Sequence, residues 1–149
     1  MATLTRRRAH GQSMVEFAMA FPIFLVLLLG LIEGGRYVLY SEILSHATTE
    51  GARYGITHGG NATCPSGPMA DGSASCDYDG DNIKQAVADA AIGLVDGGEL
   101  DVLEPTWRNP PNNDRGATIT VRVQYTYAPV VPLFGPLTIS SESSLVINN

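Results

Sequence analysis

The longest hydrophobic stretch of this 149-residue chain lies near its N-terminus, at residues 17–32, which contain no charged side chain. Glu16 directly precedes this stretch. As a helix, residues 17–32 would span about 24 Å, and a membrane part of about residues 14–32 comes close to a hydrocarbon core of roughly 30 Å. The basic residues before the helix are Arg6, Arg7 and Arg8. This pattern predicts a membrane helix with its N-terminus in the cytoplasm and the rest of the chain outside.

Three interpretations of the apolar segment compete. A cleaved secretory signal needs small residues in an Ala-x-Ala-like pattern after the apolar run, and residues 33–37 offer none. A helix buried in a soluble core needs a polar face, and residues 25–29 leave no room for one. The third interpretation is a prepilin, in which the cut falls before the helix and the helix stays in the mature product.

The residues around Gly11 match the signature of a prepilin peptidase substrate. Gly11 precedes the expected scissile bond, Gln12 follows it, Glu16 is the fifth residue after the bond, and Phe17 supplies the next, aromatic position. With this motif, the first 55 or so residues resemble the TadE-like minor pilins (pseudopilins) of the tight-adherence, or Flp-type, pilus system. The other residues that carry the resemblance are Pro22, Glu33-Gly34-Gly35-Arg36 and Gly51-Ala52-Arg53.

The resemblance implies a function and a set of partners. A prepilin peptidase would remove a cytoplasmic leader, residues 1–11, and the product would help to prime or build a type IV-like pilus. The expected partners are that peptidase, other pilin and minor pilin subunits, the pilus assembly platform in the inner membrane, and membrane lipid. The alternatives are an uncleaved, single-pass anchored extracytoplasmic binding domain, a major pilin and a membrane-anchored enzyme.

Glu16 is the residue on which the assembly interpretation depends. An ionised carboxylate inside a bilayer is costly and marks a function by default. The resemblance implies that Glu16 pairs with the new N-terminal amine at Gln12 of a neighbouring subunit. Two rival interpretations remain: Glu16 is protonated and reaches toward the membrane surface, or it pairs with the amine of its own chain.

Beyond the membrane part, the pattern predicts that the same helix continues to about Tyr54, giving an N-terminal helix over residues 12–54. Its apolar and charged positions separate onto two faces. The expected apolar face consists of Tyr37, Val38, Leu44, Ala47, Gly51 and Ala52, and the expected charged face of Arg36, Glu42, Glu50 and Arg53. Gly30, Gly34 and Gly35 either bend this helix or form a notch in which another helix packs.

A Gly-, Ser-, Asp- and Pro-rich segment at residues 55–82 predicts a loop. Cys64 and Cys76 bracket its centre. In an exported domain they are expected to form a disulfide, and the alternative is two free thiols. The acidic residues 77–82 do not complete a calcium-binding loop, and either Asp81 or Asn82 is the expected N-cap of the next helix.

The pattern in the rest of the sequence predicts a pilin-like α+β fold, in which residues 55–149 form an extracytoplasmic domain. A helix from Asn82 to about Val95, ended by Gly97-Gly98, packs on a small antiparallel sheet of about three strands. The expected strands are residues 99–103, 118–127 and 137–147, of which the second alternates cleanly between apolar and polar residues. The apolar loop at residues 130–134 lies under the sheet edge, at the membrane surface or in a subunit contact.

Composition narrows the function further. The chain has 9 basic and 15 acidic residues, a net charge of −6, which argues against nucleic acid as a partner because phosphates need Lys/Arg patches. Two cysteines do not complete a structural zinc site. No catalytic motif or phosphate-binding loop occurs in the sequence, so we expect no catalytic residues, no metal and no cofactor.

Overall fold

The structure is a computed structural model that describes residues 9–72, 75–94, 98–130 and 135–148, with side chains described from residue 11 onward. It divides into two compact units, Met1–Arg36 and Tyr37–Asn149. Helix α1, Ala9–Thr57, contributes to both units. The second unit adds helix α2 and a four-stranded antiparallel sheet, which confirms the predicted α+β class.

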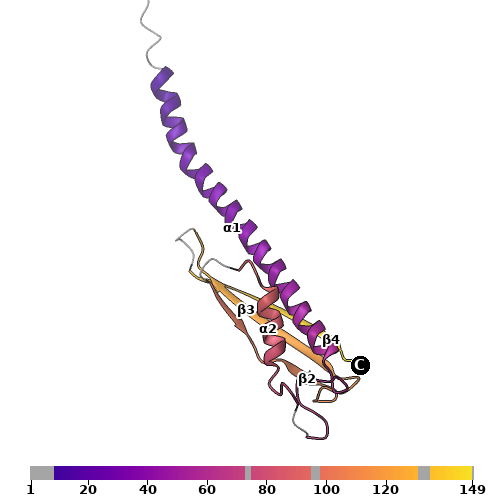
Figure 1. Cartoon of the computed structure of the whole chain (residues 1–149). Helices are drawn as coiled ribbons and strands as arrows, with labels where there is room; N and C mark the ends of the chain where they lie inside the picture. Colours follow the sequence, from indigo (N-terminus) through magenta and orange to yellow (C-terminus); the bar gives the residue numbers. More distant parts are fainter. Residues whose placement is uncertain (1–8, 73–74, 95–97, 131–134, 149) are drawn as a thin grey trace, which may run out of the picture. The chain divides into compact units, whose positions relative to one another are not determined.

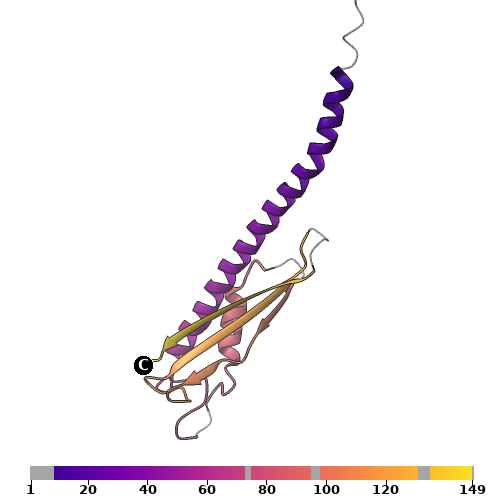
Figure 2. The same ribbon diagram turned by 180° about the vertical axis from the view of Figure 1, so that it is seen from behind.

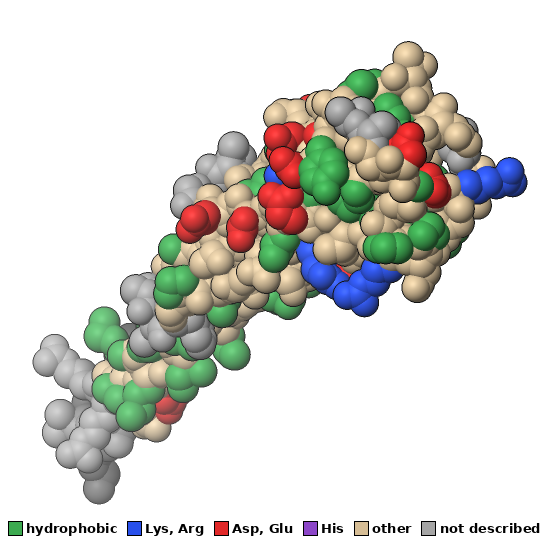
Figure 3. Space-filling model, turned by 90° about the horizontal axis from the view of Figure 1, so that it is seen from below, with side chains coloured by type: hydrophobic (Ala, Val, Ile, Leu, Met, Phe, Trp, Pro, Cys, Tyr) green, Lys and Arg blue, Asp and Glu red, His purple; other side chains and the backbone are tan. Residues whose placement is uncertain are grey.

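The first unit consists of the N-terminal part of α1. Every side chain from residue 11 to residue 32 is exposed, and apolar side chains cover this part of the helix (Figure 3). Pro22 lies inside α1 without ending it. The helix is long and apolar enough to cross a membrane, and none of its most apolar stretch is buried in the chain. A core helix would be largely buried by the rest of its chain, so the described residues do not support the core-helix interpretation.

In the second unit, the C-terminal part of α1 packs along the sheet through a stripe of mostly small residues. The buried positions are Tyr40, Leu44, Ala47, Thr48, Gly51, Ala52 and Gly55. This spacing of three and four residues is that of one helix face. The predicted burial of Tyr37 and Val38 is wrong, because the face begins instead at Tyr40, whose ring packs edge-on against Tyr125 and Tyr127 at 5.4 and 5.0 Å.

Strand β3, Thr118–Tyr127, is the centre of the sheet. Strand β4, Leu137–Val146, pairs with β3 along its whole length (Figures 1 and 2). Strands β1, Glu99–Val102, and β2, Thr106–Arg108, pair one after the other with the opposite edge of β3. Between Val102 and Thr106 this edge uses one residue more than β3 does, which is a β-bulge next to Pro105. The three-residue strand β2 is not among the strands predicted from the sequence.

The two faces of the sheet differ as the alternation along β3 predicted. The buried face of β3 consists of Ile119, Val121, Val123, Tyr125 and Tyr127. On the other face, cross-strand polar pairs join β3 to β4, including Thr120 with Ser144 at 2.8 Å between hydroxyl oxygens. Arg122 Nε donates to Glu142 Oε2 at 2.7 Å, and this guanidinium lowers the pKa of the Glu142 carboxyl below its ordinary value.

Helix α2, Asp81–Ala90, covers the same face of the sheet as α1 and buries Ile83 and Val87. The predicted end near Val95 is wrong, because the chain leaves the helix at Ala91 and Gly93 follows with a φ of 113°. The predicted N-cap is also wrong.

The N-terminus of α2 is capped from outside the helix by Asp77. Its carboxylate accepts the backbone N–H groups of Asp81 and Asn82 at 2.6 and 3.1 Å. The residue directly before the helix, Gly80, has no side chain to cap it and takes a left-handed φ of 72°.

The loop before α2 is held by a disulfide and by a buried asparagine. Cys64 and Cys76 form the disulfide, with their Cα atoms 5.3 Å apart. Asn113 is fully buried, and its side-chain amide donates to the carbonyl oxygens of Ser66 and Gly67 at 3.2 and 3.4 Å. These bonds replace the apolar core that the loop sequence lacks.

Gly51 tests the packing of α1 against α2. A Cβ at this position would collide with Val87, a fully buried and stiff side chain. The overpacking in Gly51→Ala should cost about 1–3 kcal/mol, more than the roughly 1 kcal/mol that Ala gains in a helix. We expect a lower midpoint of thermal unfolding for the detergent-solubilised chain. In the control, Gly35→Ala, the new Cβ meets no atom within 4 Å, and the midpoint should not fall. A Gly51→Ala midpoint at or above that of the unaltered chain would contradict this packing.

The disulfide gives a second prediction. Closing a loop of this size stabilises a fold by roughly 3 kcal/mol in the chain-entropy description. The double variant Cys64→Ser/Cys76→Ser should therefore unfold at lower denaturant concentration, and reductant should lower the stability of the unaltered chain but not that of the variant. Rapid alkylation of both thiols without reductant would show that the bond is absent from the protein.

Candidate functional site: the N-terminal turns of helix α1

Gln12 and Glu16 lie one helical turn apart on the same face of α1. The side-chain amide of Gln12 donates to Glu16 Oε1 at 3.3 Å. The structure thus brings together two of the residues that the sequence singles out. The spacing of four residues is a signal for this side-chain contact, whereas the expectation from the sequence concerned only the backbone amine of Gln12.

The surroundings of Glu16 are apolar. Met14, Val15, Phe17 and Met19 are exposed on the same turns of the helix, so lipid or another apolar helix would surround the carboxylate in a membrane. A neutral amide is a weaker partner for a carboxylate than a cation. The site therefore holds an acid that a nearby positive charge would stabilise further.

Gly11 is part of α1, which begins at Ala9. A Cβ at Gly11 would meet no atom within 4 Å. Nothing in the described part of the chain therefore requires a glycine here, and any such requirement comes from a molecule that binds this segment. The leader arginines Arg6, Arg7 and Arg8 lie outside the described residues.

Phe17 stacks on Phe21, with ring centroids 5.4 Å apart. One turn further on, Pro22, Ile23, Val26 and Leu27 line an apolar notch of about 280 Å³ on the helix surface. Proline has no N–H group, so the helix loses a hydrogen bond here. The three glycines at positions 30, 34 and 35 lie inside α1, which continues through them to Thr57.

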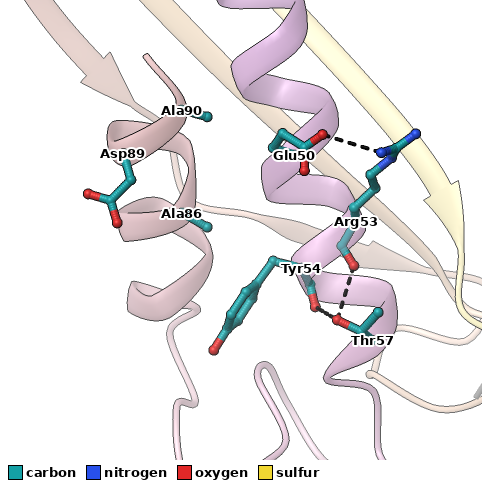
Figure 4. A pocket seen from close by; sticks show the side chains of 7 residues that line it. All are labelled: Glu50, Arg53, Tyr54, Thr57, Ala86, Asp89 and Ala90. Atoms are coloured by element: carbon teal, nitrogen blue, oxygen red, sulfur yellow. Dashed lines mark hydrogen bonds and ion pairs between the residues drawn. The ribbon is translucent and has the colours of Figure 1, made fainter. Parts of the chain in front are cut away.

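The globular unit contains a separate groove of about 520 Å³ between α1 and α2 (Figure 4). Ala86 and Ala90 of α2 point toward α1, while Asp89 points away from it (Figure 4). On α1, Glu50 pairs with Arg53 at 3.3 Å. The groove owes its shape to the short alanine side chains on its α2 wall.

The hydroxyl of Thr57 contacts the end of its own helix. Thr57 Oγ1 lies 3.2 and 2.9 Å from the carbonyl oxygens of Arg53 and Tyr54 and 3.1 Å from His58 Nδ1, which itself lies 2.9 Å from the Tyr54 carbonyl oxygen. Tyr54 stacks on His58 at 3.9 Å between ring centroids. Among the described residues, no group of three or more His, Cys, Asp or Glu side chains could hold a metal ion. The groove offers an ion pair and an aromatic ring but no arrangement typical of catalysis.

The Gly51-Ala52-Arg53 motif has a structural explanation in this unit. Gly51 lies against Val87 of α2 and Val121 of β3, and Ala52 is fully buried. Arg53 is exposed and bonded to Glu50. The first two residues therefore serve helix packing, and Arg53 lines the groove.

Comparison with known proteins gives one match. The family model described as TadE-like protein matches residues 11–53, less than a third of the chain. No curated protein and no solved structure matches the chain. The match begins at Gly11 and ends at Arg53, so it covers the apolar helix, Glu16 and the packing face up to the Gly-Ala-Arg motif. Residues 11–53 are thus similar to TadE-like proteins.

Proposed function

We propose that this protein is a minor pilin, or pseudopilin, that is cut by a prepilin peptidase between Gly11 and Gln12 and then takes part in assembling or priming a tight-adherence pilus. It would act as a structural subunit and not as an enzyme. Its partners would be the peptidase, other pilin and minor pilin subunits and the assembly platform. It would lie in the bacterial inner membrane, with its N-terminus in the cytoplasm and Tyr37–Asn149 outside, and from there enter the pilus.

The observation that carries this proposal is Glu16 on an apolar helix surface, five residues after Gly11, in the segment that matches the TadE-like family. The unburied helix supports a membrane anchor. The disulfide between Cys64 and Cys76 supports export, because such bonds persist in oxidising compartments.

Cleavage would change the charge at this site. Hydrolysis before Gln12 creates a positive amine about 6 Å along the helix axis from Glu16. In a single chain the Gln12 amide already contacts the carboxylate, but it is neutral. The amine of a neighbouring subunit would offer Glu16 a full charge in an apolar setting, where an unpaired ion is costly. Pairing would then favour subunits docked in the correct register.

The cleavage step can be tested with Gly11→Leu. A bulky side chain should block the peptidase, and the variant should accumulate as a longer, membrane-retained precursor. The control Gly30→Leu places the same side chain on the same helix, away from the proposed bond. Intact masses that are the same with and without the peptidase would reject cleavage and favour an uncleaved anchored binding domain.

The pairing step can be tested with Glu16→Ala. We expect normal cleavage and insertion but a loss of pilus assembly of about tenfold or more, counted by electron microscopy, because removing the charge removes the partner of the amine. Glu16→Asp should retain part of the assembly. Gln12→Ala removes the contact within the chain but keeps a backbone amine, so assembly should persist. Normal piliation with Glu16→Ala would show that pairing has no role.

A further inference from the structure

One end of the globular unit carries a group of exposed apolar side chains. Tyr37, Val38 and Leu39 are 48%, 59% and 56% exposed, Ile92 is 83% exposed and Val130 is 60% exposed. Three consecutive exposed residues on α1 show that the helix is bare on several sides at this point. We call Tyr37, Val38, Leu39, Ile92 and Val130 the apolar end.

Contacts within the unit place these residues at the same end of the sheet. Tyr40 of α1 packs on Tyr125 and Tyr127, at the C-terminal end of β3. Val130 follows β3 by three residues. A Cβ at Gly93, the neighbour of Ile92, would lie 3.6 Å from Cδ1 of Ile43, on the first turns of α1 within this unit.

The opposite end of the sheet is different. Gly59, after the end of α1, packs against Ile147. Val146 pairs with Thr118 and Leu137 with Tyr127, so Val146 lies roughly 30 Å along the sheet from the apolar end. Here the backbone N–H of Gly116 donates to the carbonyl oxygen of Ile147 at 2.8 Å, and the residues just before Gly116 in the sequence include the polar Asn112, Asp114 and Arg115.

We propose that the apolar end seats on the surface of the lipid bilayer, so that the globular unit contacts the membrane in which its own helix is anchored. This inference rests on the membrane anchor of the proposed function. Tyr37 follows Ile32, the last residue of the apolar stretch, by five residues, which is about 7.5 Å of helix. Chain continuity therefore holds the apolar end within reach of the bilayer at high effective concentration.

The chemistry of the apolar end matches the interfacial zone of a membrane. Tyrosine is enriched at this depth, where its ring lies among the headgroups, and exposed apolar patches mark contact surfaces. The chain has a net charge of −6, so attraction to anionic lipid does not drive the contact. We therefore expect it on zwitterionic phosphatidylcholine, with no gain from anionic lipid.

The test uses the full-length chain in phosphatidylcholine nanodiscs that hold one copy each. Ile92→Cys is labelled with an environment-sensitive fluorophore, without reductant, because the native cysteines are joined to each other. Nitroxide-bearing lipids should quench this probe at least threefold more than a probe at Val146→Cys, an exposed valine at the other end of the sheet. Adding Val130→Asp should reduce the quenching at position 92, whereas adding Val146→Asp should not.

A third probe, at Leu28→Cys in the apolar helix, separates this inference from the anchor. Strong quenching at position 28 together with equal, weak quenching at positions 92 and 146 overturns the docking and leaves the anchor in place. Weak quenching at position 28 overturns the anchor and the docking together. Unchanged quenching at position 92 in the Val130→Asp variant, with an unchanged unfolding midpoint, also overturns the docking.

Discussion

The globular unit depends on the close approach of α1 to both α2 and β3. At Gly51 the helix backbone lies against Val87 of α2 and Val121 of β3, and at Gly55 it lies against Ile119 and Ile83. Side chains at these two positions would push three elements apart at once. Because β3 is also the strand with which every other strand pairs, this contact fixes the single covered face of the sheet.

Helix α1 meets two environments with one continuous backbone. From residue 17 to residue 32 its side chains are exposed and apolar on all sides, which is the pattern of a helix surrounded by lipid. From Tyr40 onward it has one buried stripe, which suits a sheet. The TadE-like match spans both parts and ends at Arg53, so it describes an anchor together with the surface that holds the globular unit. The rest of that unit, from α2 to β4, lies outside the match.

Local patterns predicted most of the elements. The alternation from Thr118 to Tyr127 gave β3 with its observed bounds, and the charge-free run gave the exposed helix. The wrong predictions concern positions whose burial or capping is determined by a contact outside the local pattern. Tyr40 is buried in place of Tyr37 because two tyrosines of β3 lie beside it. Asp77 caps α2 from four residues before it, a reach that cap rules do not include. At the candidate site, the sequence indicated Glu16. The hydrogen bond from the Gln12 side-chain amide to Glu16 was found only in the structure.

The pair between Arg122 and Glu142 has a consequence for association between sheets. In the described part of the chain, β4 pairs with β3 alone, so its other edge is open to a further strand. Glu142 lies at the middle of β4, and two copies aligned there in antiparallel fashion would place their carboxylates opposite each other, which is destabilising. Because Arg122 lowers the pKa of Glu142, this repulsion persists to lower pH than an ordinary glutamate would allow, and it is lost only when the pH falls below that lowered pKa.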